Sequence, residues 1–279
     1  MTLRFAIRDD DVCFHTNPDQ LHDLYNEINQ ICPISFSCIP FVGGYDVDNY
    51  LPEKWEQFDL QWRDWQTKEI LPIGDNLKLV ELLKDWCSDN RATIMMHGIH
   101  HDLYEFVQDK DFKEDIREAK QYLEGLFSRS VTTSSPPNNS LGPAATKGLI
   151  HNNFNILMAF GHLPKERPIS ARNYLNFVRL LFFYFKYRKR LRLTKPMNFG
   201  THQEQPCYEI GPSTTYEGLV AGFEFALAKG GNFVIATHYY HLVANKGLHK
   251  MLIDIVAHAN NQSPGKVEFV CAEELFETL

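Results

Sequence analysis

"FAIRDDDVCF" (residues 5–14) carries three consecutive aspartates, Asp9, Asp10 and Asp11, directly after an apolar run. The run is typical of a buried β-strand. Three neighbouring carboxylates at a strand end repel one another, and Arg8 offsets only part of that repulsion. A bound cation would stabilise them, because it would be the largest charge in the vicinity. A surface turn that caps the next helix is the alternative interpretation.

Short apolar runs alternate with helical patterns along the rest of the chain. Repeated strand–helix units indicate a parallel sheet covered by helices, and they fit one α/β barrel-like domain over residues 1–279. We interpret residues 43–74, which lack periodicity, as a functional loop or lid, and we leave residues 161–213 unassigned. Strands are expected at residues 3–8, 34–41, 92–98, 131–137, 154–160, 232–240 and 266–270, and helices at 17–31, 75–90, 112–129, 146–153, 214–231 and 245–260.

Charge and composition narrow the class of protein. The formal net charge of −7 gives no general reason to expect nucleic acid as a partner. No apolar run approaches the ~20 residues that span a bilayer. The N-terminus lacks an apolar signal region, so we expect a cytoplasmic protein. Six cysteines are scattered singly, without a C-x-x-C pair, which favours reduced thiols.

Three predicted strand ends are polar, and parallel α/β folds gather functional groups at such ends. The aspartates form the first, "HGIHHD" (97–102) the second and "THYYHL" (237–242) the third. If residues 97–101 form one helical turn, His97 and His101 share a face with Cβ atoms ~5–6 Å apart. That spacing suits two ligands of one zinc ion, and a carboxylate would complete the set. A solvated histidine-rich loop is the alternative.

Two of these stretches resemble motifs of the polysaccharide deacetylases of the NodB-homology type, also called carbohydrate esterase family 4. The family's T-F-D-D-G and H-[ST]-x-x-H motifs become R-x-D-D-V and H-G-x-x-H in a divergent branch, which residues 8–12 and 97–101 match. The resemblance implies an α/β fold of the distorted (β/α)7-type barrel kind. It also implies that Asp10 is the general base. The ligands of a divalent metal would be Asp11, His97 and His101, and zinc is our first expectation for that metal.

The register of the aspartates leaves an alternative open. Along a regular strand Asp9 and Asp11 share one face and Asp10 points to the other. The family register therefore requires the strand to end at about Asp10 and the chain to turn. If the strand continues, Asp9 would take the role of the base. Asp9-x-Asp11 also matches the D-x-D pattern of glycosyltransferases, which would predict Mg²⁺ or Mn²⁺ beside a nucleotide diphosphate.

Two weaker motifs complete the resemblance. "SSPPNNSLGP" (134–143) corresponds to the third motif and implies substrate contacts by Pro137, Asn138 and Asn139, although a plain turn is an equal interpretation. It lacks the arginine that the family usually carries there, which puts the orientation of the base in doubt. "IATHYYHL" (235–242) corresponds to the last motif, whose histidine is the general acid. His238 is the first candidate for that role and His241 the second.

The resemblance implies a metal-dependent hydrolase that removes an N- or O-linked acetyl group from a sugar or glycan precursor. The cation would polarise the carbonyl and activate water. Asp10 would take the proton of the attacking water, and His238 would protonate the leaving group. A non-catalytic carbohydrate-binding barrel is a further alternative, because the expected arginine is missing.

Residues 176–195, "NFVRLLFFYFKYRKRLRLTK", join an apolar run to a basic one. One interpretation is a core-packing helix with a solvated basic end, and a subunit interface is another. A third is a patch for anionic lipid or for a phosphate-bearing sugar donor. A deacetylase without a signal sequence would meet its glycan inside the cell. We therefore expect an acetylated sugar precursor, nucleotide- or lipid-linked, as partner, and peripheral membrane contact through 176–195.

Overall fold

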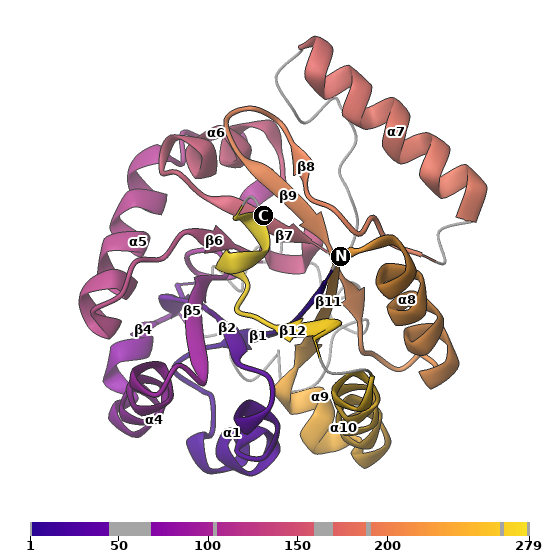
Figure 1. Ribbon diagram of the computed structural model, residues 1–279. Coiled ribbons are helices and arrows are strands. Elements are labelled where there is room, and N and C mark those ends of the chain that lie inside the picture. Colours follow the sequence, from indigo (N-terminus) through magenta and orange to yellow (C-terminus); the bar gives the residue numbers. More distant parts are fainter. Residues whose placement is uncertain are drawn as a thin grey trace.

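A curled sheet surrounded by helices forms the body of the protein (Figure 1). The computed structural model describes residues 2–44, 68–102, 105–158, 170–187, 191–262 and 265–277. Neighbouring strands run parallel from β10 to β9, and β8 is antiparallel to β9. The order of the strands is β10 (Tyr208–Glu209), β11 (Gly231–His238), β1 (Leu3–Val12), β2 (Ile34–Cys38), β5 (Ala92–Met96), β6 (Thr133–Ser134), β7 (Asn155–Met158), β9 (Gln203–Pro206) and β8 (Met197–Asn198), with β12 (Val267–Phe269) paired to the start of β1.

Helices cover the outer face of the sheet (Figure 1). Side-chain caps mark several of their starts: Asn17 accepts hydrogen bonds at the start of α1, and Asn245 does so at the start of α10. The α-helices are α1 (Pro18–Tyr25), α4 (Leu77–Ser88), α5 (Lys113–Phe127), α6 (Pro143–His151), α7 (Ala171–Tyr187), α8 (Tyr216–Lys229), α9 (Tyr239–Ala244) and α10 (Lys246–Asn261). Short 3₁₀ helices are η1 (Ile28–Gln30), η3 (Ile73–Asp75), η4 (Glu105–Val107), η5 (Pro137–Asn139) and η7 (Glu273–Phe276).

The expected α/β class is confirmed, with differences in detail. Hydrogen bonds between the described residues leave the curled sheet open between β10 and β8, so the ring closure of a full (β/α)7 barrel is not observed there. The strand expected at 34–41 divides into β2 and β3 (Phe41–Gly43), and β3 pairs with β4 (Ile70–Pro72) in a separate ribbon. Residues 45–67, the centre of the expected lid, lie outside the described residues.

Strand register brings the polar strand ends to one edge of the sheet. β1 pairs with β11 as far as Asp10↔His238. On its other side β1 pairs with β2, which in turn pairs with β5 as far as Cys38↔Met96. His97 follows Met96 directly. Asp10, Asp11, His97 and His238 therefore lie at the edge where β1, β5 and β11 end.

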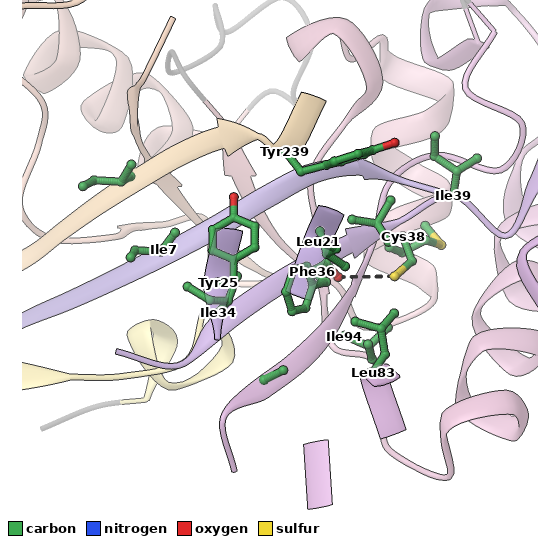
Figure 2. Close-up of a cluster of buried hydrophobic side chains, with 14 of the residues drawn as sticks. Ile7, Leu21, Tyr25, Ile34, Phe36, Cys38, Ile39, Leu83, Ile94 and Tyr239 are labelled. Atoms are coloured by element: carbon green, nitrogen blue, oxygen red, sulfur yellow. Dashed lines mark hydrogen bonds between the residues drawn. The ribbon is translucent and has the colours of Figure 1, made fainter. Parts of the chain in front are cut away.

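Alternation along β1 separates two buried layers. Phe5 and Ile7 pack toward the helices in the larger apolar cluster. Figure 2 shows Ile7 there, near Tyr25 of α1 and Phe36 of β2. Ala6 belongs to a smaller cluster inside the curl of the sheet. Because side chains alternate along a strand, the residues that follow Ala6 at steps of two also face this interior.

No described helix is long and apolar enough to cross a membrane.

Candidate metal centre

Three side chains from two strand ends converge on one point. The Asp11 Oδ1 atom lies 2.9 Å from His97 Nε2 and 2.9 Å from His101 Nε2. The two Nε2 atoms are 3.0 Å apart. All three residues are buried, and together they form a group that could hold a metal ion. At the ~2.0–2.1 Å bonds of zinc to nitrogen and oxygen, donor atoms about 3 Å apart can contact the same ion.

A bulge in β1 aims Asp11 at this point. The pairing of β1 with β2 shifts register between Asp9 and Val12. Asp11 itself has φ 65°, a left-handed conformation that aspartate adopts more readily than most residues. The strand continues to Val12, so the expectation that it ends at about Asp10 is wrong. The turn that lets neighbouring aspartates face one site is made inside the strand.

The loop after β5 presents the two histidines without a helical turn. Residues 97–101 have no helical assignment, which corrects that expectation. Gly98 has φ 68°, and a Cβ there would lie 2.3 Å from Glu105 Oε2, so only glycine fits the bend. His101 also has a positive φ, 62°. The His100 side chain points elsewhere, as expected, with Nδ1 2.8 Å from the Phe41 carbonyl oxygen.

The buried carboxylate of Glu105 holds this loop in place. It accepts hydrogen bonds from the backbone N–H groups of Ile99, His100 and His101, at 2.7 to 3.3 Å. Burial raises the pKa of Glu105, and these hydrogen bonds offset part of the effect. Three donors on one carboxylate fix a segment that contains two positive φ angles. Glu105 therefore orients both histidines, although no sequence motif marked it.

The tautomer of His97 suits metal binding. Its Nδ1 donates to the Ser135 carbonyl oxygen at 2.7 Å, so Nε2 presents its lone pair to the centre. Burial opposes protonation of His97, but Asp10 and Asp11 outweigh it and raise its pKa. Burial alone would also raise the pKa of Asp11, yet His101 and His97 hold it well below its ordinary value. The same charges that favour protons here favour a divalent cation.

Arg8 forms an ion pair with Asp10 inside the curl of the sheet. The two residues are two positions apart on β1, so they share the face of Ala6. Arg8 Nη2 lies 3.0 Å from Asp10 Oδ2, with both side chains almost fully buried. Burial would lower the pKa of Arg8, but Asp10, followed by other nearby acidic groups, raises it instead. Arg8 is therefore a permanent positive charge beside Asp10.

The stretch at 134–143 holds Arg8 in place. Arg8 Nη1 donates to Ser135 Oγ at 2.5 Å and to the Leu157 carbonyl oxygen at 2.6 Å. That stretch lacks the arginine expected from the third motif, but its Ser135 binds an arginine that comes from the first. Arg8 therefore lies against the stretch in which the family's arginine is missing.

Asp9 lies apart from the metal centre. It alternates with Asp10 and faces the helices, where the Tyr25 hydroxyl of α1 lies nearby. Burial, with the Asp10 charge second, raises the pKa of Asp9 well above its ordinary value, and Tyr25 offsets only part of this. The group of potential ligands contains Asp11 and no Asp9. The geometry therefore does not join Asp9 and Asp11 as a D-x-D site, and it does not place Asp9 as the base.

His238 borders the centre from the end of β11. Its Nε2 lies 3.6 Å from Asp11 Oδ2, and the side chain is partly exposed. Tyr240 donates its hydroxyl to the same oxygen at 2.8 Å, a contact that the sequence did not suggest. His241 lies one ring further out, with its centroid 5.1 Å from that of His238. Of the two histidines considered as general acid, His238 thus approaches Asp11 directly.

The expected substrate-binding residues form η5, which follows β6. Pro137 is buried, and its Cγ atom would lie 2.4 Å from a Cβ added to Gly98, so η5 packs against the histidine loop. Asn138 and Asn139 follow with φ angles of 54° and 49°. Asn138 is exposed and Asn139 is partly exposed. Both amides are therefore carried beside the centre on a tight turn.

Comparisons with solved structures identify the fold. A Mycobacterium smegmatis protein assigned to the polysaccharide deacetylases aligns with 98% of this chain and 88% of its own at 11% identity, with a TM-score of 0.54. A family 4 acetyl xylan esterase from Clostridium thermocellum, in complex with a cobalt ion, covers 98% and 90% at 13% identity and a TM-score of 0.46. A family 4 pseudoenzyme from Bacillus anthracis covers 99% and 66% at 9% identity and a TM-score of 0.48.

No family model and no curated protein matches the sequence. The likeness to the Mycobacterium protein shows that the chain has the fold of the polysaccharide deacetylases.

Proposed function

We propose that this protein is a metal-dependent hydrolase that removes an acetyl group, N- or O-linked, from a sugar or glycan precursor. The observation that carries the proposal is the convergence of Asp11, His97 and His101 within 3.0 Å of one another, at a strand edge that also holds Asp10 and His238. These three ligands would hold a divalent cation, for which zinc is our first choice. When bound, the cation would polarise the acetyl carbonyl and acidify water.

Asp10 acts as the general base in this proposal. Its carboxylate is buried and faces the interior, and Arg8 holds one of its oxygens at 3.0 Å. The second oxygen, Oδ1, has no hydrogen-bond partner among the described residues and would accept a proton from water. Arg8 thus places a fixed positive charge beside the proposed base, and the free oxygen faces the interior.

His238, the partner of Asp10 on the neighbouring strand, acts as the general acid in this proposal. It is the more exposed side chain of the centre and can reach a leaving group that enters from solvent. Its proton would go to the departing amine or alkoxide. Tyr240 and His97 meanwhile hold Asp11 in one orientation. Pro137, Asn138 and Asn139 would contact the sugar, which we propose is part of a nucleotide- or lipid-linked precursor.

Metal content and thermal stability test the ligand set. His101→Ala and Asp11→Ala should lose bound metal and the rise in melting temperature that zinc gives the parent, because an ion that binds only the native state stabilises it. His100→Ala is the matched control, since His100 lies in the same loop and points to the Phe41 carbonyl. Equal metal content in all three variants would contradict the assignment. Acetate release from acetylated sugars then tests the reaction.

A further inference from the structure

α7 presents an apolar stripe to solvent. Figure 1 shows the helix standing away from the sheet. The stripe consists of residues that recur every three or four positions and so share one side of the helix. Phe182 is 69% exposed and Phe185 87%, which is unusual for phenylalanine. The other members of the stripe are Tyr174, Leu175, Val178 and Leu181.

Basic residues border this stripe. Arg172, Arg179 and Lys186 recur every seven positions, so they form a row along one side of it. Arg179 and Lys186 also line a shallow hollow with Lys195 and Lys229, next to Phe182. No carboxylate is among the described residues that line the hollow. No Asp or Glu occurs between residues 170 and 195.

The opposite side of α7 fixes the helix to the body. Leu180 packs with Leu193 and Met197 in a small apolar cluster of its own. Phe183 and Tyr187 contact Phe225 of α8, with ring centroids 6.0 and 5.1 Å apart. The helix is therefore held with its apolar stripe outward.

The segment under α7 belongs to the end of the sheet opposite the metal centre. The Thr194 carbonyl accepts a hydrogen bond from Asn232 at the start of β11, and Met197 pairs with Glu204 at the start of β9. The metal centre lies where β1, β5 and β11 end. A partner on α7 thus leaves the metal centre accessible.

We propose that α7 docks this protein in the plane of an anionic membrane surface. The stripe would enter the boundary between headgroups and acyl chains, and Arg179, Lys186 and Lys195 would meet lipid phosphates. Residues 170–195 contain no acidic side chain. Two copies of this chain docked through α7 would therefore bring like positive charges together, although the formal net charge of each is −7. An anionic bilayer is favoured over a second copy for this reason. α7 is not long and apolar enough to span a bilayer, so it would lie in the plane of the surface.

Co-sedimentation of the full chain with vesicles tests the proposal. Phosphatidylcholine vesicles containing a quarter phosphatidylglycerol should bind the parent, and pure phosphatidylcholine vesicles should bind it far less. Phe182→Asp with Phe185→Asp should weaken binding at least about tenfold, because the buried apolar area is lost. Arg179→Glu with Lys186→Glu should weaken it at least about 25-fold, from ~5-fold per lost basic residue.

Leu77→Asp is the matched control, because Leu77 is 75% exposed but lies on α4. It should bind as the parent does. Circular dichroism checks that each variant is folded. Equal binding by parent and both double variants, or no binding by the folded parent, would overturn the proposal. Sedimentation velocity that shows a dimer abolished by Phe182→Asp with Phe185→Asp would assign the stripe to a second copy instead. None of these outcomes depends on hydrolysis.

Discussion

Replacing Arg8 by methionine should both impair Asp10, the proposed base, and lower the stability of the fold. Methionine keeps much of the volume of the side chain but leaves Asp10 as a buried carboxylate without its partner at 3.0 Å. Breaking a buried ion pair on one side costs about 3–5 kcal/mol in the free energy of unfolding. The hydrogen bonds to Ser135 and Leu157 are lost as well, so we expect the upper part of that range.

The same change should reduce hydrolysis by its effect on Asp10. An unpaired buried carboxylate takes up a proton, and a protonated carboxyl cannot act as a base. The contribution of a general base is about 10²–10⁴-fold. We therefore expect kcat/KM of Arg8→Met to fall by at least ~100-fold at neutral pH and to recover partly as the pH rises. Arg8→Lys should restore part of the rate, since it keeps the charge but not the second hydrogen-bonding arm.

Denaturant titration and a double-mutant cycle with Asp10→Asn measure the coupling. The double variant buries no charge at this position, so its loss should be smaller than the sum of the two single losses by about 1–3 kcal/mol. Arg4→Met is the matched control: Arg4 lies on the same strand and face and donates to the Glu274 carbonyl oxygen, far from Asp10. Additive losses, or a rate in Arg8→Met equal to that of Arg4→Met, would refute the reasoning.

Three further predictions address the remaining groups. Asp10→Asn should keep the metal and lose most acetate release. Asp9→Asn should retain both, because burial raises the pKa of Asp9 and the neutral amide resembles its protonated form. The reverse result would identify Asp9 as the base. His238→Ala should slow acetamide hydrolysis far more than hydrolysis of esters with good leaving groups. His241→Ala should slow acetamide hydrolysis much less than His238→Ala does. If His238→Ala hydrolyses both substrate types at the rate of the parent, His238 is not the acid. Burial raises the pKa of Glu273 above its ordinary 4.5, so its contribution to stability is present below pH 4.5 and is lost as the pH rises through the native pKa. Glu273→Gln should therefore lose less stability than the parent between pH 4.5 and neutrality, and identical unfolding curves over that interval would contradict this.

Apolar runs and periodicity in the sequence predicted several of the elements that position the candidate metal centre. The strand expected at 92–98 is β5, the strand expected at 232–240 is β11, and the helix expected at 75–90 is α4. α4 has a 3.6-residue pattern because one of its faces packs against the core, whereas β5 and β11 are short apolar runs that are buried on both faces. Residues 161–213 had no such pattern, and α7 explains part of this: its outer face is apolar in solvent, so hydrophobicity does not mark its buried side.

Contacts across the fold could not be predicted in the same way. The positive φ of Asp11 follows from its bulge beside β2, and nothing in residues 5–14 alone requires it. Glu105 accepts hydrogen bonds from three backbone amides, and every residue type except proline has such an amide, so no sequence motif identifies the partners. Arg8 was visible in the sequence, but its partner could not be chosen until the direction of each β1 side chain was known.

The three aspartates are compatible because each meets a different environment. Alternation sends Asp9 toward α1, where burial favours its protonated form. Asp10 faces the interior and is neutralised by Arg8. The bulge turns Asp11 toward His97 and His101, which favour its charge. Burial therefore disfavours the charge of Asp9, and the carboxylates of Asp10 and Asp11 each have a basic or metal-binding partner. The repulsion that the sequence suggested is thereby reduced by the geometry of a single strand, and the proposed base and the proposed metal ligand remain adjacent.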